Sequence, residues 1–314
     1  MHMYRFERSD RILIAGGTGF MGSHLTRRCL QDTAHVFCIS FTGKSDKAVG
    51  EKKATIMKGD LLDKDQLRSL LTGQSFDYVF NLSGYIDHTH FLRGGRKALE
   101  AHFTGLMNLV EYLDTAKLKG FVQVGSSDEY GSLPAPQKET MRECPISPYS
   151  IAKTAATHFV QTLAATEGFP GVVLRPFLVY GTGQDMKRLL PQIITACLRN
   201  EDFKTSEGKQ LRDFCYVEDV VEAMVRAALS PAAKGHVINI GSGDPVYIRD
   251  VVTKVVQIIG GGKPLWGTVL YRQGENMALY PDITLARNLL DWSPQINFDE
   301  GLKRTIAYCR TMID

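Results

Sequence analysis

The sequence of 314 residues contains no long apolar run: none approaches the roughly 20 residues that a helix needs to cross a bilayer. Its first residues, Met1 to Arg8, also lack the pattern of a signal peptide, in which an apolar segment follows positive charge. Nothing in the sequence directs the chain into or across a membrane. We therefore expect a cytoplasmic protein with no membrane partner.

Patterns typical of disulfides, metal sites and nucleic-acid binding are also missing. No two of the six cysteines have Cys-x-x-Cys spacing, so we expect reduced thiols in the core. His88 and His90 alternate, but no further ligands follow at zinc-site spacing, so we expect no metal. The net charge of +3 comes from scattered residues, which argues against a nucleic-acid partner. With 44% hydrophobic and 23% charged residues, the composition is that of an ordinary globular protein with a large core.

What the chain does have is a glycine-rich turn near its start. Gly16, Gly19 and Gly22 follow an apolar stretch, 11–15, that is typical of a buried strand, and we expect a helix to open at the third glycine. Glycines at these places allow a tight turn, close approach of backbone N–H groups to a pyrophosphate, and close packing of helix on strand. The turn therefore predicts a dinucleotide site; the alternative is a turn that binds nothing.

The second expected strand, 35–40, lacks the carboxylate with which NAD-binding units of this type end that strand. Ser40 holds its place, and Lys44 and Lys47 follow. No carboxylate is present to repel a 2′-phosphate, and either lysine would attract one. This segment favours NADP(H) over NAD; the alternative is that the lysines belong to a solvated loop.

Polar and small residues follow the next two expected strands, 54–57 and 78–82. Asp60 lies just past the first of them, where it would accept a hydrogen bond from the adenine amino group or cap the helix that follows. Ser83 and Gly84 follow the second, where small residues let the backbone run along a cofactor. Strands that alternate with helices in this way predict a parallel sheet.

A tyrosine and a lysine lie four residues apart in the next part of the chain. A long amphipathic helix, expected over 96–118 and containing His102, precedes a strand at 120–124 and the string Gly-Ser-Ser-Asp-Glu-Tyr-Gly at 125–131. Tyr149 and Lys153 then lie on one face of the helix that opens after a proline-containing loop. The pair is informative because it comes in order after the glycine turn and the hydroxyl residues.

In these motifs the chain resembles the extended short-chain dehydrogenase/reductase family, the NAD-dependent epimerases and dehydratases, and specifically its nucleotide-sugar branch. The resemblance covers nearly the whole chain and rests on Gly16-x-x-Gly19-x-x-Gly22, Gly59-Asp60-Leu61, Ser126 with Tyr130-Gly131, Tyr149-x-x-x-Lys153, Leu174-Arg175-Pro176, Val179-Tyr180-Gly181, Arg212-Asp213-Phe214-Cys215-Tyr216-Val217-x-Asp219-Val220, Asn239-Ile240-Gly241-Ser242-Gly243, Asp282-Ile283-x-x-Ala286 and Trp292-x-Pro294.

The resemblance implies an α/β enzyme with a Rossmann-type, doubly wound parallel sheet and a smaller interleaved C-terminal lobe. The sheet domain would comprise 10–178, completed by 219–241, and the lobe 179–218 and 242–314 would bind a nucleotide-diphosphate sugar. A homodimer or higher homo-oligomer is also implied, through the helices near 99–113 and 151–163. Together with the residues above, the expected cofactor contacts are Gly16, Gly19, Phe20, Met21, Gly22, Ser40, Asp60, Leu61, Leu82, Ser83, Gly84, Tyr149 and Lys153.

Tyr149 is the candidate acid/base, because oxidation of a sugar carbinol requires a base for the hydroxyl proton. Free tyrosine has a pKa near ~10, and the ammonium of Lys153 would lower the pKa of Tyr149 by favouring the phenolate. Ser126 would hydrogen-bond the reacting oxygen. Counting back from Tyr130 without a gap places Ser126 in the family's Ser/Thr position, whereas a one-residue deletion would place Ser127 there.

The same register bears on the reaction. In the 4,6-dehydratase relatives an Asp-Glu pair follows the catalytic Thr; here the ungapped register offers Ser127 and Asp128, an incomplete pair, and the gapped register offers Asp128 and Glu129. The local string looks more like that of the reductases of GDP-4-keto-6-deoxy sugars. We therefore expect a NAD(P)-dependent 4-ketoreductase or 4-dehydrogenase, with GDP favoured as the nucleotide.

Two alternatives stand beside that expectation. One is a 4-epimerase or 4,6-dehydratase with retained NAD. The other is a non-catalytic dinucleotide-binding or RNA-binding scaffold, against which the intact Ser126, Tyr149 and Lys153 argue.

Arg212 and Arg272 are the candidates for a substrate diphosphate, because planar guanidinium groups bind phosphate oxygens bidentately. The alternative is that they form ion pairs with Asp213 and Glu275. Ser127 and His88 are expected at the substrate end of the cofactor cleft.

Two residues depart from the family pattern, which usually has asparagine at the positions of His102 and Leu178. His102 is either a proton-relay or positioning residue near Tyr149 or a satisfied core histidine. Leu178 removes one expected polar contact to the diphosphate or the sugar.

Overall fold

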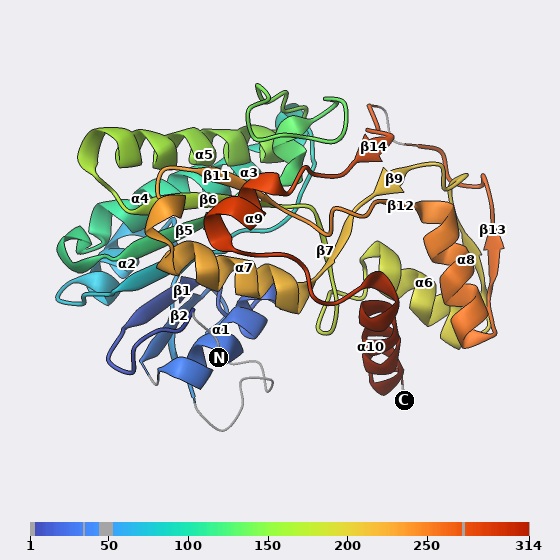
Figure 1. Cartoon of the computed structure of the whole chain (residues 1–314), viewed down its shortest axis with the longest axis horizontal. Helices are drawn as coiled ribbons and strands as arrows, with labels where there is room; N and C mark the ends of the chain where they lie inside the picture. The colour runs from blue at the N-terminus through green and yellow to red at the C-terminus, as the bar shows by residue number, and fades with distance from the viewer. Residues whose placement is uncertain (1–3, 34, 44–52, 272–273, 314) are drawn as a thin grey trace.

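A parallel sheet of seven strands organises the larger part of the molecule, as far as the described residues go (Figure 1). The computed structural model describes residues 4–33, 35–43, 53–271 and 274–313. The order in space is β11-β6-β5-β4-β1-β2-β3, and every neighbouring pair is parallel. The strands are β1 (Ile12–Ala15), β2 (Val36–Ser40), β3 (Thr55–Lys58), β4 (Tyr78–Asn81), β5 (Gly120–Val124), β6 (Gly171–Pro176) and β11 (Val237–Ile240). The strand order reverses between β1 and β4, which is where such sheets bind ligands.

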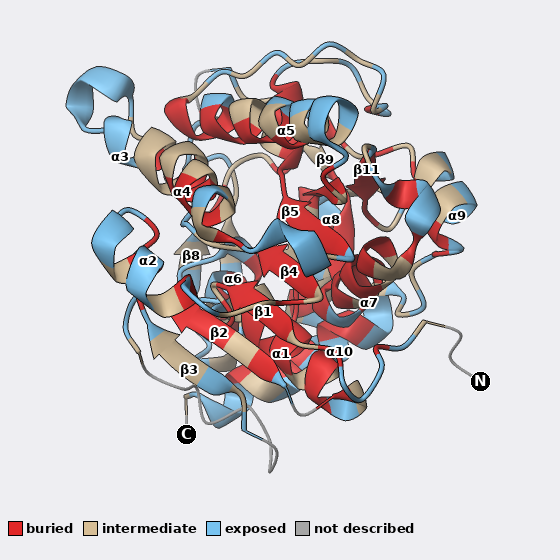
Figure 2. Ribbon diagram, turned by 90° about the vertical axis from the view of Figure 1, so that its left-hand side faces the viewer, coloured by how far each residue is buried: buried red, intermediate tan, exposed pale blue. Residues whose placement is uncertain are grey.

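Helices cover both faces of this sheet because side chains alternate along each strand. Ile12 and Ile14 belong to one hydrophobic cluster, with the helices α1 and α7, whereas Leu13 and Ala15 belong to a second, with α2, α4 and α5. Figure 2 shows the buried strands between these two layers. The helices are α1 (Phe20–Asp32), α2 (Lys64–Leu71), α3 (Arg96–Leu99), α4 (Gly105–Tyr112), α5 (Pro148–Glu167), α7 (Val217–Leu229) and α9 (Thr284–Leu290). The doubly wound α/β fold predicted above is confirmed.

A smaller lobe stands beside the sheet and is built around three helices, with short strands at its edges (Figure 1). The helices are α6 (Leu189–Leu198), α8 (Ile248–Ile259) and α10 (Phe298–Thr311). The strands are β7 (Leu178–Tyr180), β8 (Asp202–Lys204), β9 (Leu211–Arg212), β10 (Phe214–Tyr216), β12 (Val246–Tyr247), β13 (Lys263–Leu265) and β14 (Ala278–Leu279). They pair as β10-β7, β12-β9-β14 and β13-β8.

The tail of the chain does not stay in the lobe. Helix α9, from the segment 242–314, packs against β11 and α7 of the sheet domain. The segment thus crosses back to the sheet before α10 returns to the lobe. The domain boundaries given above stay a prediction.

Several elements differ from their expected bounds. Helix α1 begins at Phe20 rather than Gly22, because Gly19 in an extended conformation already forms its N-cap. The helix expected over 96–118 is three pieces, α3, a π-helical turn η2 (Glu100–Thr104) and α4, and it ends where Leu113 becomes extended. Cys144 is exposed in a loop, while the other five cysteines are buried as expected.

Short 3-10 turns complete the chain: η1 (Phe91–Arg93), η3 (Thr115–Lys117), η4 (Ser127–Tyr130) and η5 (Pro231–Ala233). No helix in the described part of the chain has the length and apolar character that a membrane span requires.

Candidate active site

The glycine turn forms a tight cradle at the carboxyl end of β1. Gly16 has a φ of +81°, and a Cβ on it would lie 2.9 Å from the carbonyl oxygen of Leu82. A Cβ on Gly22 would lie 2.0 Å from the carbonyl oxygen of Gly16. No side chain among the described residues caps the N-terminus of α1 at Gly19. The first N–H groups of α1 and the positive end of its dipole therefore face the turn, an arrangement that fits a pyrophosphate.

The adenosine side of the predicted site is only partly described. Ser40 is buried, and its hydroxyl lies 2.8 Å from Thr18 Oγ1. Lys44 and Lys47, on which the NADP(H) expectation also rested, lie outside the described residues. Asp60 does not cap α2: Asp63 does, by accepting a hydrogen bond from Gln66 N at 3.0 Å. The N-cap alternative for Asp60 is thus wrong, and the adenine role stays a prediction.

The chain after β4 runs beside this cradle. Leu82 and Ser83 border Gly16, and Gly84 has a φ of +101°. A Cβ on Gly84 would lie 2.2 Å from Cε1 of His102, so only glycine leaves room for that imidazole. The structure therefore brings together the segments after β1 and β4, at the point where the strand order reverses.

Helix α5 carries the tyrosine and the lysine. Ser147 caps it and Pro148 occupies its first turn, which fixes the start of the helix just before Tyr149. Lys153 is buried: its Nζ donates to the carbonyl oxygen of Val124 at 2.7 Å and lies 5.8 Å from the ring centroid of Tyr149. Burial lowers the pKa of Lys153 to about 8, against the opposing effect of nearby carboxylates.

The pKa of Tyr149 differs from the sequence-based expectation. Burial raises it, the negative charge of Asp128 raises it further, and a hydrogen bond with Ser126 opposes the rise. Without a bound cofactor, desolvation of the phenolate raises the pKa of Tyr149 more than the Lys153 ammonium lowers it. Burial also lowers the pKa of Lys153, to about 8, so its ammonium still predominates at neutral pH.

Ser126, rather than Ser127, is the hydroxyl beside Tyr149. The Ser126 side chain hydrogen-bonds Tyr149 and accepts from Asp128 N at 3.1 Å, as the N-cap of η4. The ungapped register therefore matches the geometry. Ser127 is buried in the first position of η4.

The carboxylates of η4 are in contrasting surroundings. Glu129 is fully buried and forms an ion pair with Arg175 at 2.7 Å, so it does not face a substrate. Asp128 is partly exposed and lies 3.6 Å from Nε2 of His88. The prediction that the gapped register supplies an acid/base pair is therefore wrong, because Glu129 is buried in the core and paired with Arg175.

Two histidines flank the ring of Tyr149. The ring centroid of His102 lies 5.0 Å from that of Tyr149, and the ring centroid of His88 lies 5.5 Å from it, both in edge-to-face geometry. His102 is buried in the π-helical turn η2, and burial lowers its pKa to about 3, which keeps the imidazole neutral.

A hydrogen bond to the backbone fixes the tautomer of His102. Its Nε2 contacts the carbonyl oxygen of Tyr85 at 2.7 Å and must therefore carry the proton. Its buried Nδ1 then offers a lone pair, for which the described residues supply no partner. His102 is therefore not a core histidine with both ring nitrogens hydrogen-bonded. Its role as a proton-relay or positioning residue near Tyr149 stays a prediction.

The substrate side of the site is less complete. Arg212 on β9 is buried and forms an ion pair with Glu275. Asp213, the partner suggested by the sequence, instead accepts hydrogen bonds from the backbone N–H groups of Ser242 and Gly243. Arg272 lies outside the described residues. The diphosphate role of both arginines stays a prediction.

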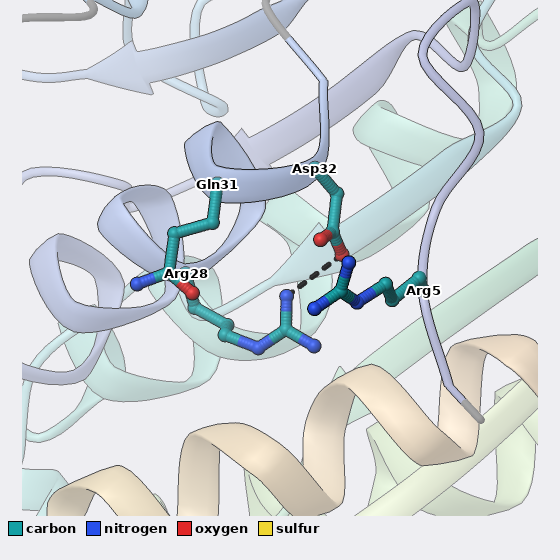
Figure 3. A pocket seen from close by; sticks show the side chains of 4 residues that line it. All are labelled: Arg5, Arg28, Gln31 and Asp32. Atoms are coloured by element: carbon teal, nitrogen blue, oxygen red, sulfur yellow. Dashed lines mark hydrogen bonds and ion pairs between the residues drawn. The ribbon is translucent and has the colours of Figure 1, made fainter. Parts of the chain in front are cut away.

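A surface hollow lies away from these residues, where the N-terminal segment meets the C-terminal end of α1 (Figure 3). Arg5, Arg28, Gln31 and Asp32 line it, and Arg28 pairs with Asp32 at 2.7 Å. The glycine turn lies at the other end of α1, so this hollow is no part of the predicted site.

The model of the NAD-dependent epimerase/dehydratase family matches residues 12–241. The chain belongs to this family. It is similar to the uncharacterized UDP-glucose epimerase YtcB of Bacillus subtilis, with 28% identity covering 96% of this chain and 98% of the relative.

Two solved structures are similar over nearly their whole length. UDP-glucose 4-epimerase of Thermotoga maritima, with UDP-glucose, has a TM-score of 0.88 at 26% identity and covers 97% of this chain and 100% of that one. UDP-glucuronic acid 4-epimerase of Bacillus cereus, with UDP-glucuronic acid and NAD, has a TM-score of 0.83 at 25% identity and covers 96% and 99%. Members of this family are enzymes that use a nicotinamide dinucleotide, and the family resemblance stated above is confirmed.

Sequence reasoning missed two features of the site. Gly17 is as constrained as its neighbours, since a Cβ on it would lie 2.4 Å from Cys38 Sγ. Arg175 is the second: it belongs to a motif of the chain, and the structure pairs it with Glu129 of the turn η4. Two buried charges of opposite sign, Glu129 after β5 and Arg175 at the end of β6, were the available signal, because these adjacent strands end at the same edge.

Proposed function

We propose that this protein is a nucleotide-sugar 4-epimerase that retains NAD and acts on a UDP-sugar. The observation that carries the proposal is the placement of Ser126, Tyr149 and Lys153 around one point beside the glycine cradle, with no complete carboxylate pair for elimination.

The roles of the residues follow from their contacts. Tyr149 takes the proton of the C4 hydroxyl and gives it back, and Ser126 holds the reacting oxygen through its hydroxyl. Lys153 supplies positive charge behind the phenol and a donor for ribose hydroxyls. Bound NAD supplies the acceptor for hydride from C4 and the source from which it returns. The glycine cradle would hold its pyrophosphate, with Phe20, Met21 and Leu61 close to the dinucleotide.

The ketoreductase favoured by the sequence has less support than its epimerase or dehydratase alternative. The family model is that of epimerases and dehydratases, and the similar proteins reported above are epimerases. An epimerase or dehydratase returns the hydride to the sugar and so regenerates its NAD, which means that the cofactor need not exchange. We therefore favour retained NAD over NADP(H), in line with the NAD in the Bacillus cereus structure.

Elimination is disfavoured by the surroundings of η4. A 4,6-dehydratase needs an acid and a base next to the catalytic hydroxyl; here Ser127 stands in one of the two places and Asp128 in the other. Glu129 is committed to Arg175 in the core. The balance between the two alternatives therefore goes to epimerisation.

The nucleotide is assigned by likeness. Both similar structures hold UDP-sugars, so we favour UDP over the GDP suggested by the local string. Arg212 would bind the diphosphate after release from Glu275, with Arg272 as a second cation, and His88 and Ser127 would face the sugar. A homodimer through α4 and α5 completes the proposal.

The test is to denature the purified protein, identify the released nucleotide by mass, and incubate native protein with UDP-, dTDP-, GDP- and CDP-sugars. We expect NAD in the released fraction and a C4 epimer from a UDP-sugar without added cofactor. A 4-keto-6-deoxy product would identify a dehydratase instead. Net consumption of added NADPH would contradict the proposal and support the 4-ketoreductase.

A further inference from the structure

Glu129 is a fully buried carboxylate that takes no proton-transfer step in the proposed reaction. Its Oε1 accepts a hydrogen bond from the backbone N–H of Ser126 at 2.8 Å. Its Oε2 accepts from Thr157 Oγ1 at 2.7 Å and from Arg175 Nε at 2.9 Å. One carboxylate thus binds a turn, a helix and a strand of the sheet.

These contacts meet the proposed catalytic residues from behind. Ser126, held through its N–H, hydrogen-bonds Tyr149 through its side chain. Thr157 lies one turn after Lys153 on α5, on the same face of the helix. Glu129 therefore links the turn that carries the hydroxyl to the helix that carries the tyrosine and the lysine.

The space around Glu129 is shaped to hold it in this position. A Cβ on Gly125 would lie 2.6 Å from Glu129 Oε1, so the residue before Ser126 must be small for the carboxylate to reach the Ser126 N–H. Arg175, itself fully buried, compensates the negative charge and also pairs with Glu143, which is partly exposed. A charged acceptor is the strongest available partner for the Ser126 N–H at this point.

We propose that Glu129 is a positioning residue that fixes the Ser126 hydroxyl against Tyr149, through its hydrogen bond to the Ser126 backbone N–H, while Arg175 compensates its negative charge. The inference rests on the proposed function for the reaction that Ser126 serves. It gives Glu129 no proton-transfer step.

The test compares isosteric variants of the two carboxylates that pair with Arg175. Glu129→Gln cannot satisfy both sides, because turning its carbonyl toward Arg175 turns its NH₂ group toward the Ser126 N–H. Glu143→Gln likewise removes one negative charge from the surroundings of Arg175. The Ser126 N–H is bonded to Glu129, so this variant leaves that hydrogen bond in place. We expect Glu129→Gln to lower kcat about 100-fold, as for a displaced catalytic group. KM for the UDP-sugar should stay within about twofold, and so should both constants of Glu143→Gln.

A second measurement does not depend on turnover. Hydrogen exchange of the peptide that spans 125–131, followed by mass spectrometry, should be faster in Glu129→Gln than in the wild type and unchanged in Glu143→Gln. If the wild type turned over no nucleotide sugar, the proposed function would fail while this readout still decided the role of Glu129.

A paired variant covers the case in which Glu129→Gln does not fold. In Glu129→Gln/Arg175→Met no guanidinium competes for the Gln carbonyl, so the carbonyl is free to face the Ser126 N–H. We expect this variant to recover both slow exchange and most of kcat. Equal loss of kcat in Glu129→Gln and Glu143→Gln, unchanged exchange in Glu129→Gln, or an inactive folded double variant would each overturn the proposal.

Discussion

The two sides of the site are built differently. The cofactor side rests on regular elements: a glycine turn between β1 and α1, and two side chains one turn apart on α5. The substrate side rests on short strands and on an ion pair between Arg212 and Glu275, far apart in sequence. Local spacing therefore specifies the first side, whereas pairing between residues distant in sequence specifies the second.

The largest effect should come from the group that both sides share. Tyr149→Phe removes the proposed acid/base hydroxyl but keeps the ring between His88 and His102. We expect kcat to fall about 1,000-fold, within the usual range for loss of a general acid/base. Bound NAD and the affinity for UDP, measured by calorimetry, should stay as in the wild type. Retention of more than a tenth of the wild-type kcat would show that the acid/base lies elsewhere.

Two alanines in the glycine turn separate folding from cofactor binding. Gly22→Ala places a Cβ 2.0 Å from the Gly16 carbonyl oxygen, so we expect a loss of unfolding free energy of about 2 kcal/mol from strain or overpacking. Gly19→Ala meets the same oxygen at 3.3 Å and should fold almost as well, yet hold NAD more weakly.

Urea unfolding and NAD titration of both variants provide the check. Equal stability of the two variants would contradict the account of the cradle.

The buried Lys153 should reduce the stability of the chain near neutral pH. Its pKa is lowered to about 8, so the unfolded chain binds the more protons between that pH and the usual lysine pKa near ~10.4. This group's contribution to stability therefore rises with pH through that window, and its cost is full below pH 8.

The variant Lys153→Met tests this directly. It should be more stable than the wild type at pH 7 by on the order of 2 kcal/mol, and the difference should shrink as pH rises through the window. Urea unfolding from pH 6 to 10 measures both curves, and the variant should be inactive. A gap that grows with pH would contradict the assignment.

The smallest effect is expected on the substrate side. Glu275→Gln weakens the pair that occupies Arg212, so KM for the UDP-sugar should fall by a few-fold, whereas Arg212→Met should raise it about 10-fold, the loss of one charged contact. NAD retention should not change in either variant. Steady-state kinetics with the released nucleotide as control gives the answer; an Arg212→Met enzyme with unchanged KM would remove Arg212 from the diphosphate site.

The sequence predicted the sheet and the glycine turn between β1 and α1 because their signals are local. Three glycines after a strand predict a tight turn into a helix, and the spacing of Tyr149 and Lys153 predicts that both lie on one face of a helix. The Ser126 or Ser127 ambiguity was not local: only the capping geometry of η4 and its packing on α5 place Ser126 beside Tyr149.

The remaining differences have a common origin. The contact of His102 with Gly84 and the pairing of Arg212 with Glu275 both join residues that are distant in sequence. No periodicity reports such contacts. For the same reason the sequence left open whether Glu129 belongs to an acid/base pair, because its place in the core, paired with Arg175, depends on a contact between distant residues.

The most direct test of the account is the path of the C4 hydrogen. A UDP-sugar with deuterium at C4 is incubated with the purified protein and no added cofactor, and the product is examined by NMR and mass spectrometry. We expect the C4 epimer with deuterium still at C4. Loss of the deuterium to solvent or to free cofactor, or a reduced product, would contradict a hydride that leaves C4 and returns to it within one enzyme.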